Sequence, residues 1–348
     1  MKFSVVIPSY NYASMLPDAI DSVLQQRRRD VEIIVGDDAS TDKTAGVLGR
    51  YGRQIRVFRN ETNSGHGPTW AKCIDAAQGE FIVNLDADDW LLPSYFDRAE
   101  AGFDAGAGVV VCSNYDFRTP TGTFVERHIA PRDALLEPAR FRNRLLRRIF
   151  FRSPGMAWRR SLSLANALPR ADIWHDDWEY LLRVSRGAAG FLIARPAAVY
   201  RIHGASMSQT SLDRLPKIRE RIESFARLVA EKANDAYLPK RERRLFMVGL
   251  AELYLRIVGT RLALRDLPAA FGHLAYATRL AAAESPELGL VAAGRGLALA
   301  MQRVGQSILP SRVINLPAEM LKPVPFAASA DSPAVPVDGA TPPPSKRS

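Results

Sequence analysis

Residues 81–89 read FIVNLDADD, an apolar run that ends in three aspartates within four positions. The run 81–85 has the length and the β-branched content of a buried strand. Two comparable runs, 3–7 and 31–35, precede it, and polar residues follow each of them directly. Because apolar residues recur at helical spacing between those two runs, the beginning of the chain predicts a strand, helix, strand unit.

The same alternation continues along the first part of the chain. The pattern predicts a helix over 44–51, a strand over 55–59, a helix over 69–77, a helix over 94–101, a strand over 109–113 and a hairpin near 117–125. This order is typical of an α/β fold with a doubly wound, mainly parallel sheet of the Rossmann-like kind. In such a sheet, ligands bind at the carboxyl ends of the strands.

The composition divides the 348 residues into three parts. The α/β pattern is expected to occupy residues 1–212. From 213 to 321, Ala, Leu, Arg and Glu dominate and apolar residues recur at helical intervals, which predicts an α-helical C-terminal region. Residues 322–348 are rich in Pro, Ala and Ser and have few large apolar residues, which predicts a disordered tail.

The formal net charge of +10 favours anionic partners, such as a phosphorylated substrate or an anionic membrane surface. Basic amphipathic helices are expected at 217–232 and 288–309. They could be solvated, pack on the α/β domain, form a dimer interface or rest peripherally on a membrane, so the oligomeric state stays open. No recognisable nucleic-acid-binding module occurs, and we expect no nucleic-acid partner.

The number of cysteines and the hydropathy of the sequence indicate the cellular compartment of the protein. Cys73 and Cys112 are too few for a disulfide framework, which favours a reducing compartment. The first apolar run stops at Pro8 and is too short for a signal peptide, and no run is long and uncharged enough to span a membrane. We expect a cytoplasmic protein, with peripheral association on the inner face of the membrane as an open alternative.

The aspartates at 86, 88 and 89 are the strongest candidate for chemistry. Asp86, Asp88 and Asp89 repel one another and would be costly at a strand end without a neutralising charge. A divalent cation supplies that charge, and Mg²⁺ or Mn²⁺ is typically held by one or two carboxylates plus substrate phosphate oxygens. The alternative is a solvated acidic turn. Because two other polar strand ends converge on the same edge, we favour a metal site.

Two polar clusters lie further along the chain. Asp176 and Asp177 precede an apolar helical run, and Asp176 alone could be a plain helix cap, but a second acid exceeds what capping needs. Arg201 and His203 lie on an expected strand that leads into a glycine-containing loop. A lone histidine is more often structural than a ligand, so His203 is a weak candidate by itself.

Taken in order, these segments resemble the family 2 glycosyltransferases with the GT-A fold. The matching segments are VVIPSYN at 5–11, EIIVGDDASTD at 32–42, NSG at 63–65 and AAQGEFIVNLDADD at 76–89. The resemblance implies an inverting enzyme that transfers a sugar from a nucleotide-diphosphate donor, with a UDP-sugar expected. The acceptor would be a glycan or a glycoconjugate, including a lipid-linked one, and the cofactor would be Mg²⁺ or Mn²⁺.

The resemblance also assigns roles to residues. The nucleobase of the donor would donate a hydrogen bond to Asp38, or to Asp37 if the turn is rotated. Asp88 would be a metal ligand, Asp86 would contact the ribose or the metal's hydration shell, and Asp89 could share the metal together with His203. Asp177, beside Asp176, would be the general base. The nucleotide pocket would comprise Pro8, Ser9, Tyr10, Asn11, Asp37, Asp38, Lys72, Asp86 and Arg201.

Two rival functions use a similar domain. A non-catalytic sugar-nucleotide binding or assembly protein would be favoured by loss of the acidic pair or of the strand-end aspartates, and both are present. A nucleotidyltransferase generally needs a glycine-rich, basic loop after its first strand, and PSYNY at 8–12 is not one. The sequence therefore predicts a glycosyltransferase.

Overall fold

The computed structural model describes residues 1–112, 114–119, 122–127, 130–147, 151–166, 168–169 and 176–203, together with six isolated residues between 272 and 282. The chain forms two compact units. The first contains every candidate site residue. In the second, which comprises 143–148 and 229–333, the six isolated residues are helical. Apart from those six, the predicted helical region 213–321 and tail 322–348 lie outside the described residues.

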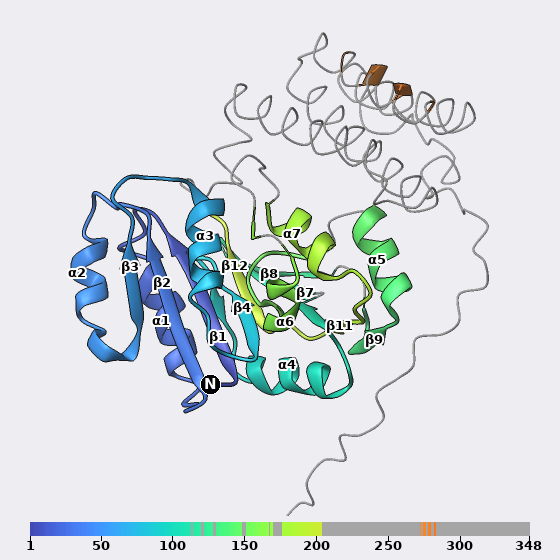
Figure 1. Cartoon of the computed structure of the whole chain (residues 1–348), viewed down its shortest axis with the longest axis horizontal. Helices are drawn as coiled ribbons and strands as arrows, with labels where there is room; N and C mark the ends of the chain where they lie inside the picture. Colours follow the sequence, from blue (N-terminus) through green and yellow to red (C-terminus); the bar gives the residue numbers. More distant parts are fainter. Residues whose placement is uncertain are drawn as a thin grey trace, which may run out of the picture. The chain divides into compact units, whose positions relative to one another are not determined.

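The first unit is built on a mixed eight-stranded sheet of order β3-β2-β1-β4-β10-β6-β11-β9 (Figure 1). Neighbours among the first four strands run parallel, as predicted, while β10 is antiparallel to both β4 and β6. The strands are β1 (Phe3–Ser9), β2 (Val31–Asp37), β3 (Arg56–Arg59), β4 (Phe81–Asn84), β6 (Val109–Cys112), β9 (Ala134–Leu136), β10 (Met156–Arg159) and β11 (Gly190–Ile193).

A second sheet of four strands has the order β5-β12-β7-β8. Its strands are β5 (Trp90–Leu91), β7 (Asn114–Thr119), β8 (Gly122–Arg127) and β12 (Ala198–Arg201). The pair β7–β8 is the predicted hairpin. Because β5 directly follows the three aspartates and pairs with β12, this sheet brings the end of β12 back to the end of β4.

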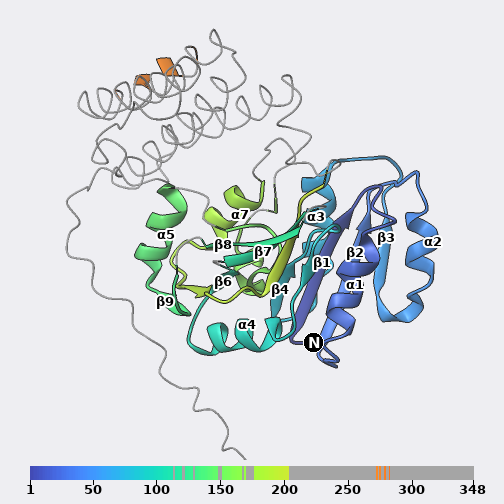
Figure 2. The ribbon, with the colours of Figure 1, turned by 180° about the vertical axis from the view of Figure 1, so that it is seen from behind.

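Helices cover both faces of the parallel strands. Figures 1 and 2, seen from opposite sides, show α1 and α3 on opposite faces of β1. Since both faces are covered, β1 is buried along its whole length and reads as a continuous apolar run. The helices are α1 (Leu16–Leu24), α2 (Thr44–Gly49), α3 (His66–Asp75), α4 (Tyr95–Asp104), α5 (Pro138–Arg147), α6 (Arg160–Leu164) and α7 (Asp176–Val184), with a 3₁₀ turn at Gly52–Gln54. Among the described residues, no helix has the length and hydrophobicity that a membrane span needs.

The structure differs from the sequence-based expectation at three places. Helix α3 begins at His66 rather than at residue 69, because Gly65 with φ of 90° turns the chain into the helix. Helix α7 includes Asp176 and Asp177 in its first turn. Residues 156–159, for which the sequence pattern predicted no strand, form the strand β10 between β4 and β6.

Gly36 in β2 allows α3 to pack closely on the sheet. A Cβ atom at this position would lie 2.6 Å from Phe58 Cζ and 2.9 Å from both Cys73 Sγ and Thr69 Cγ2. Thr69 and Cys73 belong to α3, so the absence of a side chain at Gly36 sets the separation between this helix and β2. That separation positions the N-terminus of α3 beside the ends of the parallel strands.

We expect Gly36→Ala to lower the free energy of unfolding by about 1–3 kcal/mol, since the added methyl overpacks the contact between α3 and β2. The matched control is Gly46→Ala in α2, where a Cβ would meet no atom within 4 Å. The control should be neutral or stabilising by up to about 1 kcal/mol, because alanine favours a helix. Urea denaturation measures both, and equal stabilities would contradict the close-packing argument.

Candidate active site

Three strand ends meet at one edge of the sheet, as the sequence predicted. Strand β1 lies between β2 and β4, with Ser9 opposite Asp37 and Val6 opposite Asn84. The acidic residues after β2 and β4 therefore flank the end of β1. All predicted site residues after these three strands share this edge.

The buried carboxylate of Asp38 anchors the loop between β3 and α3. Its Oδ1 accepts hydrogen bonds from Asn60 Nδ2 at 2.7 Å, from the Ser64 amide at 2.8 Å and from Ser64 Oγ at 3.0 Å. Its Oδ2 accepts from the Gly65 amide at 2.8 Å. Burial raises the pKa of Asp38, but these donors outweigh it and leave the pKa below its ordinary value. Asp38 is thus ionised, and both of its oxygens accept hydrogen bonds from the NSG segment at 63–65.

Several other predicted nucleotide-pocket residues also hold loops in place. Asp37 pairs with Arg59 at 2.7 Å. Asn11 Oδ1 accepts from the Thr41 amide at 2.8 Å. The exposed Lys72 donates to Asn60 Oδ1 at 2.7 Å and so extends the Asp38 network.

The residues at the end of β1 present free groups. The Ser9 hydroxyl is buried and has no hydrogen-bond partner among the described residues. Tyr10 is 40% exposed, whereas Pro8 is buried beneath it in the strand. A buried hydroxyl without a partner is costly unless a ligand satisfies it, so Ser9 suits contact with a polar ligand.

Asp86 is surrounded by groups that favour its charged form and by others that oppose it. Its Oδ1 lies 3.3 Å from Asn84 Nδ2, 3.3 Å from Ser153 Oγ and 4.0 Å from His66 Nε2. Burial raises the pKa of Asp86 to about 6; His66 lowers it and the charge of Asp88 raises it further. A neighbouring cation would favour the ionised form.

Asp88 and His203 form the candidate metal pair. His203 Nε2 lies 2.9 Å from Asp88 Oδ2, and the ring of Tyr12 packs edge-on against the imidazole with centroids 6.0 Å apart. Across the part of the chain that the structure describes, no three acidic, histidine or cysteine side chains converge as a ready-made metal site. One carboxylate and one imidazole fit an ion that takes its remaining ligands from a diphosphate and water.

Asp89 faces away from this pair toward β12. Its Oδ1 accepts the Arg201 amide at 2.7 Å, while its buried Oδ2 has no partner among the described residues. Burial and the charges of Asp88 and Asp86 raise the pKa of Asp89 well above its usual range. In this arrangement Asp89 fixes the end of β12, two residues before His203.

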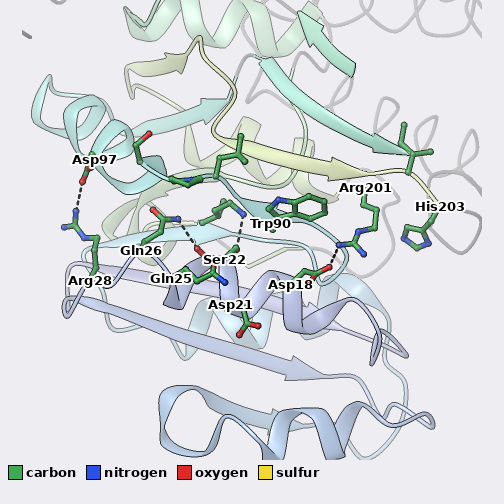
Figure 3. A pocket seen from close by; sticks show the side chains of 15 residues that line it. Asp18, Asp21, Ser22, Gln25, Gln26, Arg28, Trp90, Asp97, Arg201 and His203 are labelled. Carbon is green, nitrogen blue, oxygen red and sulfur yellow. Dashed lines mark hydrogen bonds and ion pairs between the residues drawn. The ribbon is translucent and has the colours of Figure 1, made fainter. Parts of the chain in front are cut away.

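The guanidinium of Arg201 lies on the α1 side of the site. It pairs with Asp18 at 2.5 Å and stacks over the Trp90 ring, with its Cζ 4.7 Å from the ring centroid. Asp18 and Arg201 line a groove of about 900 Å³ that also reaches His203. Figure 3 shows this pair and the other labelled side chains that line the groove. A role for Arg201 at a diphosphate would require exchange of Asp18 for phosphate oxygens.

The acidic pair lies in the first turn of α7. Asp176 Oδ1 accepts the Asp177 amide at 2.9 Å, and Asp177 Oδ1 accepts the Trp178 amide at 2.7 Å. Burial, and next the charge of Asp176, raise the pKa of Asp177 to about 7. Asp177 is therefore poised to gain or lose a proton near neutral pH, as a general base requires.

The structure adds His66, which the sequence reasoning missed. Its Nδ1 lies 2.7 Å from Asp176 Oδ2, so one imidazole joins the α7 pair to the Asp86 side of the site. Burial lowers the pKa of His66, but Asp176 and Asp86 more than offset this and raise it to about 9. The signal available in the sequence was its place directly after the NSG segment.

Comparisons with known proteins agree with this architecture. The family model described as glycosyl transferase family 2 matches residues 4–166. An uncharacterized glycosyltransferase of Nostoc sp. is 37% identical over 33% of this chain, and the chain spans 37% of that relative's length.

Two solved structures share the fold. TarS of Staphylococcus aureus, in complex with UDP-GlcNAc, matches with a TM-score of 0.65 and 19% identity over 87% of this chain and 89% of its own. A mannosyltransferase of Pyrobaculum calidifontis, in complex with GDP-Man and Mn²⁺, matches with a TM-score of 0.55 and 18% identity over 88% and 87% of the two chains. The GT-A fold is thereby confirmed.

We expect Asp38→Asn to destabilise the protein by about 1–3 kcal/mol, because an amide places N–H groups against buried donors that the carboxylate now satisfies. Asp75→Asn, at the exposed C-terminal end of α3, is the control and should change stability little. Thermal unfolding of both variants measures the difference. Equal melting temperatures would show that the loop does not depend on Asp38.

Proposed function

We propose the reaction of this protein from the premise that the chain, through its residues 4–166, belongs to glycosyl transferase family 2. The protein transfers a sugar from a nucleotide-diphosphate donor to a hydroxyl of a glycan or glycoconjugate, with inversion at the anomeric carbon. The observation that carries the proposal is the meeting of Asp88–His203 and Asp176–Asp177 around Asp86, at the ends of the parallel strands.

The donor is proposed to be a UDP-sugar, as in the TarS complex with UDP-GlcNAc. The nucleotide would lie over the end of β1, where the unsatisfied Ser9 hydroxyl and the exposed Tyr10 offer contacts. Asp38 and Asp37 support this pocket from below by holding the adjoining loops. Asp86, close to both acidic groups, would face the ribose.

Asp88 and His203 would hold a divalent cation, Mn²⁺ or Mg²⁺, beside the diphosphate. The bound ion offsets the negative charge that gathers on the departing diphosphate. The mannosyltransferase complex with Mn²⁺ supports this assignment. Asp89 contributes by fixing the end of β12, and Arg201 would add positive charge after leaving Asp18.

Asp177 is proposed as the general base. It takes the proton of the acceptor hydroxyl as the hydroxyl oxygen attacks the anomeric carbon from the face opposite the diphosphate. The new glycosidic bond forms as the bond to the diphosphate breaks, so a single displacement inverts the configuration. Asp176 orients this residue through the Asp177 amide.

The acceptor is proposed to belong to a polysaccharide or glycoconjugate, with a lipid-linked form included. Such an acceptor would suit a cytoplasmic protein whose basic helices rest on the inner face of the membrane. The predicted helices at 217–232 and 288–309 lie outside the described residues. Sedimentation with anionic vesicles tests this part of the proposal.

Asp177→Asn should lower turnover by at least about 1000-fold and change the affinity for UDP less than about threefold, because the amide keeps the shape but cannot accept the proton. UDP release from a panel of sugar nucleotides measures turnover, and calorimetry measures UDP affinity. Asp104→Asn, on the exposed end of α4, is the control and should behave as the parent.

The pH dependence tests the same assignment. Asp177 has a raised pKa of about 7, so its active, deprotonated form is lost as the pH falls through that value. The ratio kcat/KM, which reports the free enzyme, should fall about tenfold for each unit below about pH 6 and level off above about pH 8. An active Asp177→Asn enzyme, or a profile that is flat across neutral pH, would remove Asp177 as the base.

Chelation should stop turnover, and Asp88→Ala should abolish the Mn²⁺-dependent part of UDP binding, because the carboxylate that faces the ion is lost. Calorimetry with UDP, with and without Mn²⁺, measures this effect. Asp75→Ala, at the exposed C-terminal end of α3, is the control. Unchanged Mn²⁺ dependence in Asp88→Ala would eliminate Asp88 as a ligand.

A further inference from the structure

His66 lies between two carboxylates that come from distant parts of the chain. Asp86 follows β4, and Asp176 begins α7. We propose that His66 is a positioning residue for the transfer reaction: it fixes the Asp176–Asp177 pair relative to Asp86 and so aligns the base with the bound donor. This inference rests on the function proposed above.

The contact with Asp176 is a direct hydrogen bond. Nδ1 of His66 and Oδ2 of Asp176 are 2.7 Å apart, and the imidazole donates because a carboxylate oxygen accepts. The other oxygen of Asp176 accepts the Asp177 amide at 2.9 Å. The carboxylate of Asp176 thus links the His66 imidazole to the backbone amide of Asp177, the proposed base.

The opposite edge of the imidazole faces Asp86. Nε2 lies 4.0 Å from Asp86 Oδ1, and Asn84 and Ser153 hold that carboxylate from the other side. Nε2 of His66 therefore lies toward Asp86, which is proposed to face the donor. Nδ1 lies against Asp176, beside the proposed base. Movement of the ring would change both separations together.

Three features hold the ring itself in place. His66 is the first residue of α3, and the Gly65 amide before it is tied to Asp38 at 2.8 Å. One turn later Trp70 packs against the imidazole, with ring centroids 5.8 Å apart. Trp70 is fully buried and meets Tyr180 of α7 with centroids 5.3 Å apart, so an apolar contact joins the same two helices.

The imidazole is also partly exposed to solvent. Although the ring lies among the carboxylates, 26% of the His66 side chain is exposed. Part of the ring is therefore open to solvent, and the ring also lies against both Asp86 and Asp176.

The two ring nitrogens can be tested separately by substitution. In His66→Asn the side-chain amide nitrogen occupies the place of Nδ1 and can still donate to Asp176. In His66→Gln it occupies the place of Nε2 and faces Asp86. His66→Ala removes both, and Glu61→Ala, exposed on the loop before α3, is the control.

Turnover of the full chain is measured as UDP release from the best sugar nucleotide of the panel, with Mn²⁺. His66→Ala should lower kcat about 30-fold and change KM and UDP affinity less than about threefold. His66→Asn should recover kcat to within about threefold of the parent, while His66→Gln should stay near His66→Ala. A thermal melt of each variant reports whether it is folded.

Hydrogen exchange gives a readout that needs neither metal nor activity. Without ligand, amide exchange at the first turn of α7 should accelerate about tenfold or more in His66→Ala and in His66→Gln, and return near the parent rate in His66→Asn. Equal exchange in all variants would overturn the proposal, as would rescue of kcat by Gln instead of Asn. A parent protein that releases UDP from no donor would instead overturn the proposed function, and the exchange result would still decide whether His66 positions α7.

Discussion

The site depends on one buried carboxylate that is satisfied entirely by the protein. Asp38 follows β2 and gathers the side chain of Asn60 and the amides of Ser64 and Gly65 around its two oxygens. Burying an ion costs free energy unless such donors replace its water. Because those donors come from the loop before α3, the position of Asp38 determines where α3 begins, and with it the position of His66.

Because of these hydrogen bonds, the segments GDD at 36–38 and NSG at 63–65 act together to position α3. Gly36 leaves room for α3 to pack on β2, and Asp38 fixes the chain that enters the helix. Neither residue touches the proposed base. Both nevertheless set the geometry of the edge at which Asp86 and Asp176 meet.

The sequence could predict the parallel strands and the polar residues at their ends, because continuous apolar runs and turn formers are local signals. It could not predict β10, since an antiparallel strand inserted beside β4 has no local signature in residues 156–159. His66 was missed for a related reason. Its partners are separated from it by many residues, and the expected helix began at residue 69, which left His66 in a loop. The resemblance to a known family identified the residue types of the site. Which side chains contact one another depends on tertiary packing, which the sequence does not show.

The balance of charge at this edge favours a bound cation. Asp86, Asp88 and Asp177 lie there together with Asp176. The imidazole of His66 lies against Asp176 and Asp86, and the imidazole of His203 lies against Asp88. Arg201 is paired with Asp18 instead. Burial raises the pKa values of Asp86 and Asp177, and the charges of the neighbouring carboxylates raise them further. A divalent ion held by Asp88 beside a diphosphate would add positive charge at this edge and relieve the repulsion among the carboxylates. Asp177 would then feel less negative charge and would ionise more readily when the donor is in place, so that the base becomes competent as the leaving group is positioned.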